Sequence, residues 1–532
     1  MAFSAKHISI EDTGFFAPVI KDYVGAAGDL RGFYDHEVSI SGVKAAIEKR
    51  AGFKFDRELL SKVLSAQYQK VEMHSEVQKN LSLLSQENTF TVCTAHQPNI
   101  FTGHLYFVYK ILHAVRLADE LSKSIDGKNF VPVFYMGSED ADLEELGSIE
   151  IDGKAYHWNT DQKGAVGRMK VDKALISLID EISLQISVQP YGEEVVGMLR
   201  NAYRLNETVE DSTFRLINEM FGRFGLIVLL PDSKMLKDSF VPVLRKELEE
   251  EFSGKAVRST LEKFPEKYKV QAAGRSINLF YLEEQLRERI EKHESGFIVN
   301  NSTLSFSKTE MLEELEKHPE RFSPNVILRP VYQEWILPNV AFIGGGGELA
   351  YWLELKEVFN AVEIPMPVLV LRNSFMIVPK RFVQIAGKWD LEVEDLFMKK
   401  NDLINKTVSA HSSTQVDLTD ERIRLSEIFK TISSVAGNAD QTLAKHADAV
   451  HHTLMKKISG IEKKMMRAAK KKDVILVNQV TNLYDSLFPR GSLQERVENI
   501  IPFYSRWGSD FFNVLLQYSR GLEQDFTIIC EK

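Results

Sequence analysis

The stretch TVCTAHQPNIFTGHLYFVYKI, from Thr91 to Ile111, decides the fold that the chain is expected to adopt. An apolar run from Phe90 to Thr94 predicts a short buried strand, and the amphipathic pattern from Leu105 to about Leu121 predicts a helix. The loop between them is polar and contains His96, Gln97, Asn99, Thr102, Gly103 and His104. Because the first N–H groups of a helix are unpaired and carry partial positive charge, this order of elements predicts a site for a nucleotide or another anion.

Other apolar runs predict further buried strands and an α/β fold. They are Phe130–Met136, Gly225–Leu230, Val326–Val331, Val340–Ile343 and Pro367–Leu371. The runs are continuous rather than alternating, and helical stretches separate most of them. This pattern is typical of a parallel sheet that is buried on both faces.

The chain is predicted to divide into three parts. Residues 1–379 would form the α/β core with an N-terminal helical segment and inserted subdomains at about 147–225 and 252–322. From 380 to 475 the strand signals vanish and apolar residues recur in steps of three and four, which predicts an extended helical hairpin of the coiled-coil type. Residues 476–532 show a mixed pattern again and are expected to return to the core. In this last part Ser492 and Glu495 have the spacing of a helix capping box.

Composition excludes several classes of protein. A net charge of −9 gives no sign of general nucleic-acid binding, and two cysteines, Cys93 and Cys530, cannot form a disulfide framework or a metal cluster. No apolar run approaches the roughly 18 residues of a membrane span, and the start of the chain has no signal-peptide pattern. We therefore expect a cytoplasmic protein without a membrane partner. The basic stretch Lys456–Lys472 is interpreted as a solvated helix face, with contact to an anionic ligand or a partner subunit as the alternative.

Polar residues follow the predicted strands at the point where each strand ends. The carboxyl ends of parallel strands share one edge of a sheet, where open α/β folds bind ligands. We therefore expect a crevice lined from several strand ends. The residues at these ends are His96 and Gln97, then Ser138, Glu139, Asp140 and Asp142, then Asp232, then Gly344, Gly345, Gly346, Gly347 and Glu348, and finally Arg372, Asn373 and Ser374.

Each of these groups has a functional and a structural interpretation. His96 could be functional or could instead be satisfied by backbone bonds in a turn. His104, at the predicted helix start, could donate to a developing oxyanion as a neutral imidazole. The acidic cluster could balance a substrate ammonium group or Mg²⁺ accompanying ATP, or be an exposed helix start. Arg329 and Tyr332 could clamp a carboxylate or phosphate, with a structural salt bridge as the alternative for Arg329.

Four successive glycines before a predicted helix let backbone N–H groups approach a ligand closely. The run is neither GxGxxG with its distal acid nor GxxxxGK[ST]. A nicotinamide site or a P-loop is therefore not supported.

Together these motifs resemble the bacillithiol-biosynthesis enzymes of the BshC family, the cysteine ligases. The resemblance covers essentially the whole chain, in order. It implies a Rossmann-like parallel-sheet core with inserted connecting segments, similar to class I aminoacyl-tRNA synthetases, plus an α-helical coiled-coil domain that can mediate a homodimer. The matching stretches are HQPNIFTGHLYFVYKI at 96–111, VPVFYMGSEDADLEEL at 131–146, FSPNVILRPVYQEWILPNVAFIGGGGELAYWLELKEVF at 322–359 and LFPRGSLQERVENIIPF at 487–503.

The chain departs from the family pattern at three places. The family more often has glycine at the position of Ala95, proline at that of His104, and GGPGE where this chain reads GGGGE at 344–348. His104 is therefore a weaker candidate than His96. No lysine loop of the KMSKS kind is visible, so adenylation rests on analogy with related folds.

The resemblance implies the last step of bacillithiol synthesis, in which L-cysteine is joined to glucosaminyl-malate. We expect an amide-forming ligase that activates a carboxylate with ATP or another nucleotide, with Mg²⁺ accompanying it and no structural metal. The expected catalytic residues are His96, Gln97, Asn99 and His104. The expected binding residues are Gly103, Tyr106, Lys110, Glu139, Asp140, Asp142, Arg329, Tyr332, Gly344, Gly345, Gly346, Gly347, Glu348, Tyr351, Trp352, Arg372 and Ser374.

Two alternatives remain open at this level. One is a non-catalytic, coiled-coil dimeric scaffold that binds a metabolite. The other is a nucleotidylyl transferase of different specificity.

Overall fold

The computed structural model describes residues 2–294, 296–413 and 416–532. Within them the chain forms two compact units. The larger unit comprises Ala5–Met376 and Ser492–Thr527, and the smaller is formed mainly by Ile377–Gly491. A further three-stranded sheet has the order β1-β15-β14 (Phe3–Ile8, Phe526–Glu531 and Ser374–Val378), and one boundary between the units falls within each of these strands, with a further boundary after Gly491.

The core of the larger unit is a five-stranded sheet of order β13-β12-β2-β3-β6, paired in parallel throughout. This confirms the predicted α/β class. Most residues of these strands are buried, which explains why their sequences are continuous apolar runs. The strands are β2 (Thr89–His96), β3 (Asn129–Met136), β6 (Ile227–Leu229), β12 (Asn339–Gly344) and β13 (Val368–Leu371).

The strand order reverses direction between β2 and β12. From β2 the chain moves outward to β3 and β6, then returns to β12 on the other side of β2 and continues to β13. Open α/β sheets have their ligand crevice outside the carboxyl ends of the strands at such a reversal. The topology therefore places the expected crevice after His96 on one strand and after Gly344 on its neighbour.

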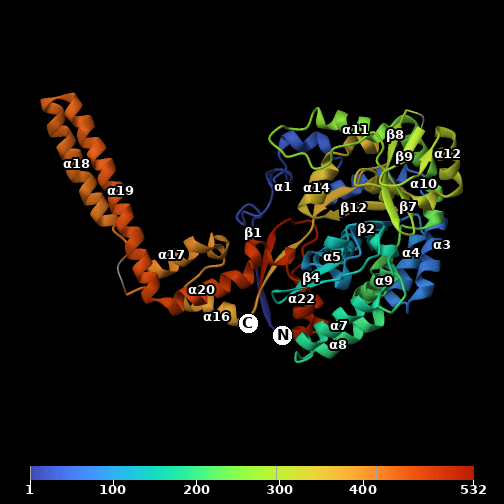
Figure 1. Cartoon of the computed structure of the whole chain (residues 1–532), viewed down its shortest axis with the longest axis horizontal. Helices are drawn as coiled ribbons and strands as arrows, with labels where there is room; N and C mark the ends of the chain where they lie inside the picture. The colour runs from blue at the N-terminus through green and yellow to red at the C-terminus, as the bar shows by residue number, and fades with distance from the viewer. Residues whose placement is uncertain (1, 295, 414–415) are drawn as a thin grey trace. The chain divides into compact units, whose positions relative to one another are not determined.

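Helix α5 (Leu105–Ser124) packs against the sheet beside β2 and β3 (Figure 1). Its inner face, with Ala114, Leu117 and Leu121, joins Val92 and Val340 in one apolar core. The periodicity of the sequence predicted this helix, and burial of one apolar stripe explains its length.

Further helices surround the sheet in the larger unit. The N-terminal ones are α1 (Pro18–Val24), α2 (Ile40–Ala51), α3 (Arg57–Gln67) and α4 (Ser75–Leu84), and later ones are α10 (Lys234–Glu250), α11 (Phe252–Leu261), α14 (Gly346–Leu353) and α15 (Lys356–Ala361).

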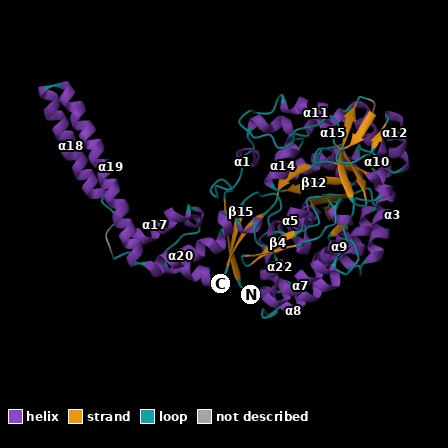
Figure 2. Ribbon diagram, in the orientation of Figure 1, coloured by secondary structure: helices purple, strands orange, loops and turns teal. Residues whose placement is uncertain are grey.

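Two insertions interrupt the alternation of strand and helix. The first has the short helix α6 (Leu143–Leu146), the hairpin β4 and β5 (Ser148–Ile151, Lys154–His157) and helices α7 (Lys173–Ile186), α8 (Gly192–Ala202) and α9 (Val209–Phe221). The second is an antiparallel sheet of order β10-β9-β8-β7-β11, beside α12 (Figure 2). Its elements are β7 (Leu279–Glu283), β8 (Leu286–His293), β9 (Gly296–Val299), β10 (Ser305–Phe306), α12 (Lys308–Lys317) and β11 (Phe322–Pro324).

The strand predicted at Val326–Val331 is wrong, because this segment leads into helix α13 (Leu328–Ile336). Oδ1 of Asn325 accepts from the backbone N–H of Ile327 at 2.9 Å, which starts the turn. Pro330 lies in the first helical turn, where its missing N–H costs nothing. A short apolar run cannot by itself distinguish a strand from one turn of a buried helix.

The smaller unit is helical, as predicted. Helices α18 (Thr419–Ala439) and α19 (Gln441–Lys472) form an antiparallel pair (Figure 1), and α16 (Lys380–Lys388), α17 (Lys400–His411) and α20 (Val474–Leu487) pack at its base. That base has its own apolar core, which includes Leu403, Val408, Ala469 and Val480. The predicted breaks at Ser412–Ser413 and Gly437–Asn438 fall at or within one turn of helix ends.

The segment Ser492–Thr527 belongs to the larger unit and contains α21 (Ile501–Trp507) and α22 (Asp510–Tyr518). The predicted capping box of Ser492 and Glu495 is wrong. Gln494–Arg496 is a single short turn capped by Leu493, and the Glu495 side chain is buried against Arg372 instead. Among the described residues, no helix combines the length and the apolar character that a membrane crossing requires.

Candidate functional site

A cavity of about 380 Å³ opens at the carboxyl edge of the parallel sheet. Residues at the ends of β2, β3 and β12 and residues of α13 and α14 line it. Residues of the second insertion and of the C-terminal segment complete the lining. The predicted site residues that the structure brings together there are His96, Gln97, Tyr106, Lys110, Glu139, Asp140, Arg329, Gly345, Gly346, Gly347, Glu348, Tyr351 and Arg372.

His96 ends β2 and has an imidazole packed against the rings of Tyr106 and Phe107. Its Nε2 atom is out of contact with solvent and has no hydrogen-bond partner among the residues that the structure describes. Burial, followed by the positive charge of Lys110, holds the pKa of His96 well below its usual value. The ring is therefore neutral at ordinary pH and has a nitrogen that a ligand can use as donor or acceptor.

Lys110 is buried on α5 and reaches the start of α14. Its Nζ donates to the carbonyl of Ala95 at 3.0 Å and forms an ion pair with Glu348. Burial lowers the pKa of Lys110, and Glu348 partly offsets this effect. Oε2 of Glu348 also accepts from the backbone N–H of Gly345 at 2.8 Å.

Arg372 follows β13 and forms a buried ion pair with Glu495, in which its Nη2 donates to Oε1 at 2.7 Å. Its Nη1 donates to the carbonyl of Asn373 and to Oγ of Ser374, both at 3.0 Å. Burial alone would lower the pKa of Arg372, but Glu495 outweighs it and raises that pKa. The Nε atom of Arg372 is buried and, within the described ranges, has no hydrogen-bond partner.

The acidic side of the cavity is formed by Asp140 and Glu139. Oδ2 of Asp140 accepts from Nε2 of Gln97 at 3.1 Å, and Oδ1 lies 3.8 Å from Nη1 of Arg287. The guanidinium of Arg287 in turn lies over the ring of Phe280, 3.9 Å from its centroid. Asp140 is partly exposed, so its carboxylate can contact a ligand.

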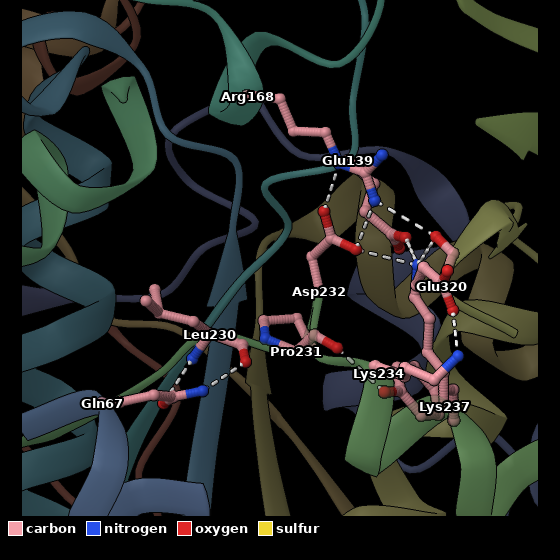
Figure 3. Close-up of polar contacts among 10 residues, drawn as sticks. Gln67, Glu139, Arg168, Leu230, Pro231, Asp232, Lys234, Lys237 and Glu320 are labelled. Atoms are coloured by element: carbon pink, nitrogen blue, oxygen red, sulfur yellow. Dashed lines mark hydrogen bonds and ion pairs between the residues drawn. The ribbon is translucent and has the colours of Figure 1, made fainter. Parts of the chain in front are cut away.

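Glu139 belongs to a buried ionic cluster that is centred on Lys237 (Figure 3). Nζ of Lys237 pairs with Glu139, and with Oδ1 of Asp232 at 2.9 Å. Arg168 donates to both oxygens of Asp232, at 2.7 and 2.9 Å. Burial alone would raise the pKa of Asp232, but Lys237 and Arg168 lower it to about 2. Both Glu139 and Asp232 therefore have cationic partners already.

The other predicted residues lie outside the cavity. Asp142 caps the short helix α6 through the N–H of Glu145, Tyr332 donates to the carbonyl of Pro231 at 2.9 Å, and Ser374 contacts Arg372. Trp352 is buried and stacked on Phe342, with 4.3 Å between ring centroids. Gly344 closes β12, where an added Cβ would lie 2.9 Å from the Phe342 ring.

The loop before α5 is held by the C-terminal segment rather than open to a ligand. Phe101, Thr102 and Gly103 have φ of 50°, 73° and 63°, and the amide of Asn499 donates to the carbonyls of Phe101 and Gly103. His104 is the N-cap of α5, and its Nδ1 lies 3.0 Å from the carbonyl of Val497. The N–H of Leu105 donates to the carbonyl of Glu498 at 2.8 Å. The start of α5 therefore does not supply the predicted anion site.

Asn99 is buried beneath the same loop. An added Cβ on Gly103 would approach the Asn99 Cβ to 2.8 Å, so the turn requires glycine there. Of the predicted catalytic residues, Asn99 and His104 shape this loop, whereas His96 and Gln97 face the cavity.

Sequence reasoning missed Arg287 and Arg496, which line the cavity, and Lys237, which lies behind it. Arg287 lies in the strongly charged strand β8 and Arg496 ends the short turn Gln494–Arg496, so neither differs from ordinary surface arginines by sequence pattern. Lys237 lies on α10 and Asp232 precedes that helix, and a separation of five positions is not a helical pair spacing, so no local pattern indicated this pair.

Among the described residues, no group of three or more His, Cys, Asp or Glu side chains could hold a metal ion. An ion that accompanies a nucleotide needs only one or two protein carboxylates, and Asp140 is placed for such a contact.

A parallel sheet with a polar cavity at its topological reversal defines a Rossmann-like α/β protein with a small-molecule site. The comparisons with known proteins give the family. The model described as "Bacillithiol biosynthesis BshC, N-terminal Rossmann-like domain" matches residues 3–373, and the one described as "Bacillithiol biosynthesis BshC, C-terminal coiled-coil domain" matches 375–531. The chain belongs to the BshC family, as its resemblance implied.

Similar curated proteins are named "Putative cysteine ligase BshC". The one from Flavobacterium johnsoniae is 38% identical over 98% of this chain and 99% of its own length. The one from Christiangramia forsetii is 37% identical over 98% of each chain. Among solved structures, a chain named "putative arginyl t-RNA synthetase" from Campylobacter jejuni covers 83% of this chain at 10% identity, with a TM-score of 0.21 that is too low to bear on fold or activity.

Proposed function

We propose that this chain is a cytoplasmic cysteine ligase that joins L-cysteine to glucosaminyl-malate through an amide bond, as the last step of bacillithiol synthesis. Membership of the BshC family and the names of its relatives support the reaction class. The observation that carries the proposal is the convergence of separate sequence motifs on one cavity. His96, Asp140, Gly345 and Arg372 come from four different strand ends and line the same space.

Amide formation in water needs an activated carboxylate, and a nucleotide such as ATP would supply that activation. The groups at the cavity suit a polyanion. The Nε of Arg372 lacks a partner, and the glycines at the start of α14 expose backbone beside it. Mg²⁺ would accompany the nucleotide, and Asp140 would be the carboxylate to hold it, because Glu139 and Glu348 already have cationic partners.

The amine of glucosaminyl-malate must lose a proton as its C–N bond forms. The neutral imidazole of His96 can accept that proton at Nε2, because this atom has no protein partner. Asp140 can hold an ammonium group at the acidic side, since Glu139 is already paired with Lys237.

The malate part carries two carboxylates and needs cationic partners. Arg329 donates to the hydroxyl of Tyr351, and within the described part of the chain no carboxylate pairs with it or with Arg496. We assign these two arginines, with Arg287, to the malate carboxylates. Arg372 is less available for this role than the sequence predicted, because Glu495 already occupies one end of its guanidinium.

We also propose a homodimer through α18 and α19. Helix α18 buries none of its residues in the single chain, and Ile428 and Val435 are 55% and 66% exposed. An apolar stripe left open on a long helical pair is the pattern of a coiled-coil interface.

Cells from which the gene has been deleted provide the test of the proposed reaction. Mass spectrometry of their small thiols should show loss of bacillithiol and accumulation of glucosaminyl-malate, both reversed by the gene on a plasmid. Normal bacillithiol in the deletion strain would refute the ligase and favour a metabolite-binding scaffold.

A further inference from the structure

The cavity is cationic overall, yet an acidic side chain lies at its most cationic point. Of the described residues that line it, five are cationic (Lys110, Arg287, Arg329, Arg372 and Arg496) and three are acidic (Glu139, Asp140 and Glu348). Glu139 and Asp140 lie together after β3. Glu348 lies alone on the opposite, basic side, at the start of α14.

The carboxylate of Glu348 has the contacts that a bound anion would have. Oε2 accepts from the N–H of Gly345 at 2.8 Å and pairs with the ammonium of Lys110. The Lys110 side chain is only 3% exposed, whereas that of Glu348 is 21% exposed. The lysine is therefore fixed in the protein, and the glutamate reaches it from the solvent-facing side.

A second cation, Arg372, has one unpaired N–H at the same place, although its other end is bound to Glu495. The Arg372 side chain is 5% exposed, and its Nε atom has no hydrogen bond. An ideal Cβ built on Gly345 would lie 3.7 Å from this Nε and 3.4 Å from Oε2 of Glu348, so all three groups surround one small space. An unpaired buried guanidinium N–H costs free energy, which an incoming anion would recover.

We propose that Lys110 Nζ, Arg372 Nε and the Gly345 N–H form an anion subsite that Glu348 fills in the ligand-free chain, and that a ligand carboxylate or phosphate displaces Glu348 from it. When the ligand binds, its anionic group takes the place of the Glu348 carboxylate, and the Glu348 side chain turns toward solvent. This subsite rests on the proposed function in one respect, namely that the cavity binds the substrates.

The opposing interpretation is that Glu348 is simply a helix cap. Glutamate at the third helical position commonly accepts from the N-cap N–H, and Glu310 does the same with Ser307 on α12. A cap alone does not need a buried lysine or an orphan arginine nitrogen. The two interpretations differ in the effect of removing the charge: a cap needs only an acceptor oxygen and predicts unchanged ligand affinity, whereas the subsite predicts tighter binding.

The test is Glu348→Gln, which keeps an acceptor for the Gly345 N–H and removes the charge. Glu310→Gln is the matched control, since it makes the same change in an exposed capping box on another helix. Isothermal titration calorimetry would measure the affinity of each full-length protein for pyrophosphate, for ATP and for L-malate. No ligase turnover is needed, so the result is independent of whether the proposed reaction is correct.

We expect Glu348→Gln to bind at least one of these probes about tenfold more tightly than the wild type, the scale of one partly solvated charge pair, with Glu310→Gln unchanged. A gain in affinity for pyrophosphate and ATP alone would show that the subsite binds phosphate. A gain in affinity for malate alone would show that it binds a carboxylate. Adding Lys110→Met to Glu348→Gln should remove the gain. Unchanged or weaker binding of every probe by Glu348→Gln, or no binding by either protein, would overturn the subsite.

Discussion

The guanidinium of Arg372 and the carboxylate of Glu495 form a buried ion pair, 2.7 Å apart, between residues separated by 123 positions in the chain. Oε2 of Glu495 also accepts from the N–H of Phe375 at 3.2 Å. This pair joins the last strand of the parallel sheet to the C-terminal segment and fixes one wall of the cavity.

Replacing Glu495 with alanine should destabilise the larger unit by about 3–5 kcal/mol, because it leaves a buried arginine without its counter-ion. Urea unfolding followed by fluorescence would measure the loss. Glu523→Ala, which removes an exposed ion pair with Arg520, should cost under about 1 kcal/mol. Equal effects of the two substitutions would contradict the importance of the buried pair.

The ionic cluster around Lys237 predicts a dependence of stability on pH. The pKa of Asp232 falls from 3.8 to about 2 on folding, so its contribution is present above pH 4 and is lost as pH falls toward 2. Lys237→Met should reduce stability at pH 7 by about 3–5 kcal/mol and flatten this acid dependence. Urea unfolding from pH 2 to pH 7 would measure both quantities.

Lys234→Met is the control for Lys237, since Lys234 lies on the same helix and its ion pair with Glu320 is largely exposed. It should leave both the stability and its acid dependence nearly unchanged. If the free energy of unfolding depends on pH equally steeply in Lys237→Met and in the wild type, the pKa of Asp232 does not depend on this lysine.

Alanine substitutions at Gly103 and at Gly347 are expected to have opposite effects on the stability of the protein. Gly103 has a φ of 63° and no room for a Cβ, so Gly103→Ala should destabilise the protein by more than about 1 kcal/mol. A Cβ on Gly347 meets nothing within 4 Å, and Gly347 lies in the first turn of α14, so Gly347→Ala should leave stability unchanged or raise it by up to about 1 kcal/mol. Thermal denaturation of both variants checks the contrast, and a larger loss for Gly347→Ala would contradict it.

The proposed dimer predicts a change in mass. Val435→Lys places a charge on the exposed apolar stripe of α18 and should convert a dimer to a monomer in light scattering after size exclusion. Ser434→Lys, at the neighbouring exposed position, should remain dimeric. A wild-type protein that is monomeric at micromolar concentration would refute the interface.

The parallel sheet could be predicted from sequence because its strands are buried on both faces and leave continuous apolar runs, as at Phe130–Met136. Polar residues at strand ends then indicated the cavity, and His96, Asp140 and Gly345 do line it. The Val326–Val331 run failed because a short apolar segment has no period long enough to separate strand from helix.

The parts of the site that sequence could not predict depend on contacts between distant residues. Glu495 had capping-box spacing, but its role is set by its ion pair with Arg372, which follows β13. Likewise, nothing near His104 in sequence indicates that the Val497–Asn499 segment covers the start of α5. Local sequence patterns predict the helices, the strands and the edge of the sheet at which a ligand binds. Contacts between residues that are distant in sequence determine which side chains face the ligand.

The most direct test of the ligase is reconstitution with purified protein, ATP, isotopically labelled L-cysteine and glucosaminyl-malate, with mass spectrometry of products and measurement of AMP and ADP. The wild type should form labelled bacillithiol in step with one nucleotide product. His96→Ala, folded as judged by circular dichroism, should be slower by about 100-fold or more, and His104→Ala by less than about tenfold. Absence of bacillithiol with the wild type, or an undiminished rate with folded His96→Ala, would contradict the account.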